Sequence, residues 1–113
     1  MNTKYWYLRC ALSFAQGGLV ENARYWLEKA DEESLLLSGM PLASSVKERI
    51  ISTAELAGVF RSLELAIMFG EANKPNMIYW LNRAVELSEN KPYASFVRRI
   101  TEMLREKPAY AST

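Results

Sequence analysis

Apolar residues recur every three or four positions along most of the chain, which is the pattern of helices with one buried side. No stretch alternates apolar and polar residues between hairpin turns, as half-buried strands would. The pattern therefore predicts an all-α fold of five to six helices. These helices are expected over about 3–16, 20–37, 41–58, 59–70, 76–88 and 92–107.

Glycine and proline residues mark the ends of several predicted helices. Gly18 and Gly39 follow the first two helices, and glycine adopts the left-handed conformation of a helix C-cap without steric cost. Pro41 and Pro92 are expected in the first turns of the helices that they open, because proline lacks only an N–H that has no partner there.

The segment after Gly58 is the most apolar of the chain, which predicts a central helix covered on most sides by its neighbours. Glycine lowers helix stability, so Gly58 is a place for a break or a bend. The sequence leaves open whether 41–58 and 59–70 form one helix or two. Glu64 lies within this apolar segment, where an unpaired buried carboxylate would be costly, and we expect it to pair with Arg61 or to lie at the rim.

Two parts of the chain resemble each other. Segment 25–30 (YWLEKA) recurs as 79–84 (YWLNRA), and the flanking residues also match in the same order. Such collinear matches predict an internal duplication of a helical unit. The sequence does not decide whether the two copies stack or pack about a pseudo-twofold axis. The predicted organisation is a single domain over 1–113, with copies at about 5–54 and 59–106 and a tail at 108–113.

The first two predicted helices resemble a tetratricopeptide repeat. The residues that carry the resemblance are Tyr7, Cys10, Ala11, Phe14, Gly18, Ala23, Leu27 and Ala30. The likeness is best over 7–30 and weaker over 65–84, where the turn is longer and Met77 replaces a small residue. The resemblance implies antiparallel helix pairs and a protein or peptide partner rather than a reaction.

Composition and charge exclude several classes. The chain has 113 residues, of which half are hydrophobic, and a net charge of +1 that is too small to drive polyanion binding in general. Its apolar runs are too short to span a membrane, and its first residues do not read as a secretion signal, so a cytoplasmic protein is expected. Cys10 is the only cysteine, and its neighbours predict a buried thiol.

The chain contains no histidine, so it lacks the commonest general base and the commonest transition-metal ligand. We therefore expect no enzyme, no cofactor and no metal site. An acidic cluster within 28–33 lacks the alternating loop spacing of a calcium site and is expected to be a solvated helix face. An enzyme in which Glu64 or tyrosine residues worked with a partner or a cofactor is the third alternative.

The predicted function is a non-catalytic protein-interaction or scaffold module. Its partner is expected to be another protein or a second copy of the chain in a homodimer. Trp26 and Trp80 are expected in the core, whereas Tyr25, Tyr79 and Tyr93 are the candidate partner-binding residues. The alternative is a small subunit of a nucleic-acid-binding complex that uses the basic last helix. Its candidate contacts are Arg98, Arg99, Arg105 and Lys107.

Overall fold

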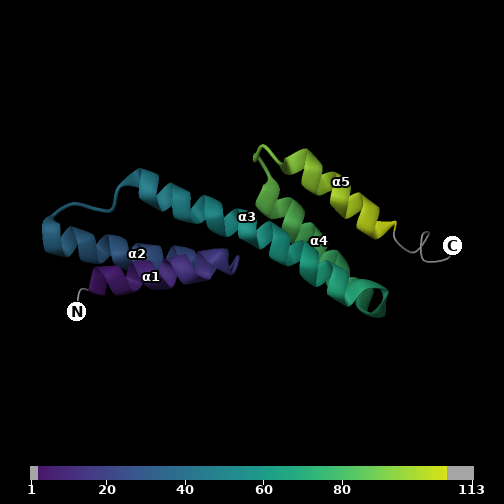
Figure 1. Cartoon of the computed structure of the whole chain (residues 1–113), viewed down its shortest axis with the longest axis horizontal. Helices are drawn as coiled ribbons and strands as arrows, with labels where there is room; N and C mark the ends of the chain where they lie inside the picture. Colours follow the sequence, from purple (N-terminus) through teal and green to yellow (C-terminus); the bar gives the residue numbers. More distant parts are fainter. Residues whose placement is uncertain (1–2, 107–113) are drawn as a thin grey trace. The chain divides into compact units, whose positions relative to one another are not determined.

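The computed structural model describes residues 3–106 and contains helices but no strand in that range. The all-α prediction is therefore confirmed. The helices are α1 (Thr3–Gln16), α2 (Val20–Ser38), α3 (Ser44–Phe69), the 3-10 helix η1 (Gly70–Asn73), α4 (Lys74–Ser88) and α5 (Ala94–Arg105) (Figure 1). The predicted tail at 108–113 lies outside the described residues.

Helix α3 joins what the sequence presented as two helices. It continues for 26 residues through Gly58, so 41–58 and 59–70 do not form separate helices. Glycine within a helix costs about 1 kcal/mol relative to alanine, which burial of the flanking residues outweighs. Gly58 is itself buried, and its carbonyl oxygen accepts a hydrogen bond from the Ser62 hydroxyl at 2.7 Å.

The predictions for Pro41 and Pro92 were wrong by a few residues. Helix α3 begins at Ser44 and α5 at Ala94, so Pro41 and Pro92 precede the first turns instead of lying in them. The Ala43 carbonyl accepts the first amide bonds of α3, which places the helix start after the proline turn. The Gly39 prediction is confirmed, because this residue has φ 74° and its N–H donates to the Leu35 carbonyl.

The chain divides into two compact units, Met1–Ala57 and Gly58–Thr113, which we call the N-terminal unit and the C-terminal unit. Helix α3 supplies residues 44–57 to the first unit and 58–69 to the second. The division falls between the two copies expected from the sequence.

In the N-terminal unit, α1 and α2 lie side by side and run antiparallel (Figure 1). Their contact is lined by small buried residues, since Ala11, Ala15, Ala23 and Ala30 are all almost fully buried. Small side chains allow two helix backbones to approach closely. Thr3 donates a hydrogen bond to the Glu33 carboxylate at 3.0 Å, which joins the start of α1 to the last part of α2.

In the C-terminal unit, α4 packs against α5. Leu81 and Ala84 of α4 and Val97 of α5 are almost fully buried. The Arg61 guanidinium of α3 lies over the Trp80 ring of α4, at 5.3 Å from the ring centroid, and this cation–π contact joins α3 to α4 within the unit.

The apolar segment after Gly58 is not covered on most sides, so that prediction was wrong. One side of the helix is buried, at Val59, Ser62, Leu63 and Ala66. Phe60, Ile67 and Met68 are exposed on other sides. The four buried residues are spaced as one face of a helix. Phe60, Ile67 and Met68 lie outside that face, so they stay exposed although they are apolar.

Candidate functional site

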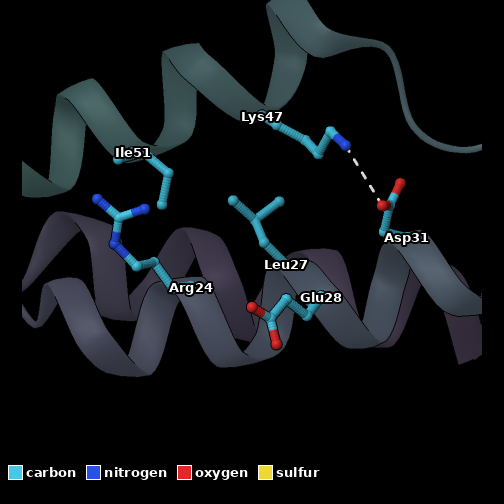
Figure 2. A pocket seen from close by; sticks show the side chains of 6 residues that line it. All are labelled: Arg24, Leu27, Glu28, Asp31, Lys47 and Ile51. Atoms are coloured by element: carbon cyan, nitrogen blue, oxygen red, sulfur yellow. Dashed lines mark hydrogen bonds and ion pairs between the residues drawn. The ribbon is translucent and has the colours of Figure 1, made fainter.

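A groove lies between α2 and the first part of α3 in the N-terminal unit (Figure 2). Its volume is about 210 Å³. We call it the Asp31 groove; its lining residues are Arg24, Leu27, Glu28, Asp31, Lys47 and Ile51. Figure 2 shows Leu27 and Ile51 between the two helices, with Lys47 and Asp31 facing each other at one end. The groove thus combines an apolar centre with charged ends.

Three of the four charged residues that line the Asp31 groove, Arg24, Asp31 and Lys47, form ion pairs within the chain. Lys47 Nζ lies 3.3 Å from the Asp31 carboxylate, and Arg24 lies 4.0 Å from the Glu55 carboxylate. Asp31 also accepts a hydrogen bond of 2.7 Å from the Leu42 backbone N–H. Asp31 therefore connects α2 to the loop before α3 and to α3 itself, which favours a structural role for this groove.

We expect Asp31→Ala to lower the free energy of unfolding by about 1–2 kcal/mol, because it removes the acceptor of the Leu42 N–H and the partner of Lys47. Asp31→Asn is the matched control, since its amide oxygen still accepts from Leu42, and its loss should be smaller. Urea denaturation followed by circular dichroism measures both. Equal losses in the two variants would contradict the role assigned to the Leu42 hydrogen bond.

A second groove lies between α4 and α5 in the C-terminal unit and has a volume of about 410 Å³. We call it the α4–α5 groove; its lining residues are Asn82, Val85, Glu86, Glu89, Arg98, Thr101, Glu102 and Arg105. Two of the arginines predicted to contact nucleic acid, Arg98 and Arg105, therefore share one groove. Three glutamates line it with them, and Arg105 donates to the Asn82 side-chain oxygen at 2.6 Å.

The three predicted nucleic-acid contacts that the structure describes, Arg98, Arg99 and Arg105, do not line one groove together. Arg98 and Arg105 lie among carboxylates, which repel phosphate. Arg99 is exposed but does not line the α4–α5 groove, and Lys107 lies outside the described residues.

A third groove lies between α1 and the first part of α3, with a volume of about 440 Å³. We call it the α1–α3 groove; its lining residues are Leu8, Leu12, Ser45, Val46, Arg49 and Ile50. Leu12 remains 48% exposed and Val46 is also exposed, so the apolar lining faces solvent. Tyr5 is exposed one helical turn before Leu8 on the same side of α1.

Sequence reasoning missed the α1–α3 groove. The periodicity placed Tyr5, Leu8, Leu12 and Ala15 on one apolar stripe of the first helix, beside a second stripe that contains Ala11 and Phe14. The structure buries Ala15 at the end of the first stripe and leaves Tyr5 and Leu12 exposed. A surface helix in a small protein buries about one such stripe. The presence of two stripes was therefore the available signal that one of them would be exposed.

The candidate partner-binding tyrosines differ in exposure. Tyr25 and Tyr79 are 51% and 58% exposed, whereas Tyr93 is half-buried just before α5. Each exposed tyrosine meets the next tryptophan edge to face, at 5.1 Å for Tyr25 with Trp26 and 5.0 Å for Tyr79 with Trp80. Both tryptophans are half-buried rather than core residues. The same local arrangement thus occurs in both units.

Cys10 and Glu64, the remaining candidates for chemistry, are not enclosed by the fold. Cys10 is half-buried, so the prediction of a buried thiol overstated its burial. Glu64 is exposed and carries no burial cost, while the guanidinium of Arg61 lies against Trp80. Within residues 3–106, no group of three or more histidine, cysteine or acidic side chains is arranged to hold a metal ion.

Comparison of this chain with protein-family models, with curated proteins and with solved structures found no match. In the part of the chain that the structure describes, no helix is both long enough and apolar enough to cross a membrane. Inferences about function therefore depend on the grooves and exposed faces described above.

Proposed function

We propose that this chain is a non-catalytic protein-interaction module and that the α1–α3 groove is its binding surface. The carrying observation is that the groove is open and mainly apolar, with Leu12 and Val46 of its lining left exposed by the rest of the described residues. Contiguous exposed apolar surface is characteristic of protein-interaction sites. The Asp31 groove is a weaker candidate because Lys47 pairs with Asp31 across it and Arg24 pairs with Glu55.

The proposed duplication supports this assignment. When Cys10-Ala11 is aligned with Leu65-Ala66, Tyr5 corresponds to Phe60 and Leu12 to Ile67. All four of these corresponding side chains are exposed. An aromatic residue and an aliphatic residue two turns later are therefore presented in both units, which fits the proposed tetratricopeptide-like arrangement and a repeated binding surface.

A nucleic-acid partner is the less favoured proposal. The α4–α5 groove holds more carboxylates than guanidinium groups among its lining residues. A protein partner with both acidic and basic side chains matches such a surface better than a phosphate backbone does.

The test is selection of binders from a displayed random-peptide library, followed by fluorescence anisotropy with the enriched peptides. We expect Leu12→Glu to weaken binding at least tenfold, because it places a charge in the apolar groove. Met68→Glu is the matched control, since Met68 is exposed, does not line the α1–α3 groove and is not one of the repeated surface residues Phe60 and Ile67. Peptides that bind the wild type and Leu12→Glu equally would contradict the proposal, as would salt-sensitive binding of generic DNA or RNA in place of peptides.

A further inference from the structure

The outer face of α2 is a second exposed surface in the N-terminal unit that nothing in the described chain covers. Helical spacing places five exposed residues on it, which we call the α2 ridge: Tyr25, Glu28, Glu32, Leu35 and Leu36. Leu36 is 80% exposed. Lys29 Nζ lies over the Tyr25 ring at 5.5 Å from its centroid, and Glu28 also lines the Asp31 groove. The ridge therefore combines two carboxylates and one flanking ammonium group with large exposed apolar side chains, which are characteristic of protein-interaction surfaces.

The α1–α3 groove is the chemical complement of the α2 ridge. Its lining includes Arg49 and no acidic residue among the described side chains that form it. Arg9 is exposed on α1, one turn from Tyr5 and from Leu12, on the same side of that helix. The groove is thus apolar along its length with two guanidinium groups at its edges.

We propose that the α2 ridge of one copy docks into the α1–α3 groove of a second copy. This inference rests on the proposed function and names the partner as the chain itself. An amphipathic helix in an apolar groove is a common recognition mode, and opposite charges at its edges fix the register. Arg9 and Arg49 would meet Glu28 and Glu32, while Leu35 and Leu36 fill the groove.

The ridge is no longer than the helix that carries the groove. The ridge extends over twelve residues from Tyr25 to Leu36, about 16 Å, and α1 has twelve residues from Tyr5 to Gln16, of which Leu8 and Leu12 line the groove. One helix in one groove is a small interface, near the lower limit of about 1,200 Å² in total for specific interfaces, and contacts of this size are typical of transient association, so we expect assembly to depend on concentration. The ridge points away from the α1–α3 groove of its own unit. The buried side of α2, at Ala23, Leu27 and Ala30, is on the side of the helix opposite to the ridge.

Ridge and groove are different surfaces, so the contact is head-to-tail and each copy offers one of each. Light scattering and sedimentation equilibrium from about 1 μM to 1 mM should therefore give a mass that rises with concentration above the 12.9 kDa of one chain. The mass should fall at high salt, because the edge pairs are exposed. A wild-type protein that remains monomeric up to 1 mM would overturn the proposal.

A mixing experiment tests the head-to-tail geometry directly. Leu12→Glu disables the groove and leaves the ridge intact. The double variant Leu35→Asn/Leu36→Asn disables the ridge and leaves the groove intact. Each variant alone should be monomeric, and an equimolar mixture should give a complex of two chains that grows no further. Met68→Glu and Met68→Asn are the matched controls, which should assemble like the wild type. A mixture that stays monomeric, or either variant assembling alone, would overturn the proposal.

One further measurement separates this inference from the proposed function. A synthetic helical peptide with a leucine and glutamate face like that of the ridge is titrated into wild-type protein and into Leu12→Glu, with circular dichroism confirming that both are folded. Groove-dependent binding of this peptide to a protein that never self-associates would overturn the second-copy inference and leave the interaction module standing. Failure of both peptide binding and self-association would remove both proposals.

Discussion

Leu81→Ala is expected to lower the free energy of unfolding by about 3 kcal/mol, because it removes a leucine side chain from a fully enclosed site. Leu81 is 0% exposed and is the largest fully buried side chain in the described chain. It lies on α4, the helix that packs against α5 in the C-terminal unit. Truncation leaves a cavity that the surrounding helices fill only in part, so the lost transfer free energy and the cavity cost add.

Urea denaturation at neutral pH, followed by far-ultraviolet circular dichroism, measures this loss. The matched control is Met68→Ala, since Met68 is 73% exposed and a surface truncation of this kind changes stability by less than about 0.5 kcal/mol. A loss for Leu81→Ala no larger than that for Met68→Ala would show that α4 is not packed as described.

Local sequence signals predicted the first helical hairpin. The bounds of α1, the Gly39 cap and the small inward residues of α1 and α2 follow from periodicity and from the conformational freedom of glycine, which act within a few residues of each other. Helix α3 did not follow from such signals. The cost of a glycine in a helix, about 1 kcal/mol, is similar to the gain from burying one neighbour, so only the packed structure decides whether the helix continues.

The candidate sites depended more strongly on tertiary contacts. Periodicity placed Arg98 and Arg105 on one side of the last helix, but it gave no information on Glu86 of α4 and Glu89 directly after α4, which line the same groove. It also supplied two apolar stripes for α1 without indicating that the stripe with Leu12 would line an open groove. The exposure of Tyr25 and Tyr79 could be predicted from the sequence, because each lies opposite the buried alanine and leucine positions of its own helix. Such a position depends on the periodicity of one helix and not on its neighbours.

Gly58→Pro is expected to lower the free energy of unfolding by about 3 kcal/mol or more, which is the usual cost of a proline in the interior of a helix. Proline at this position removes the N–H that would donate to the Ala54 carbonyl, and its ring clashes with that same carbonyl. Both residues are buried, so the helix has no solvent side on which to accommodate the ring. The two units share α3, so a break at Gly58 should disrupt the helix that belongs to both.

Ser44→Pro is the matched control for this substitution. Ser44 is the exposed first residue of α3, where proline is tolerated because its missing N–H has no helical partner. Urea denaturation should place Ser44→Pro within about 0.5 kcal/mol of the wild type. Hydrogen exchange should show lost protection in α3 for Gly58→Pro alone. Equal stability of the two variants would mean that α3 is interrupted at Gly58 in solution, and the single long helix would then have to be replaced by two shorter ones.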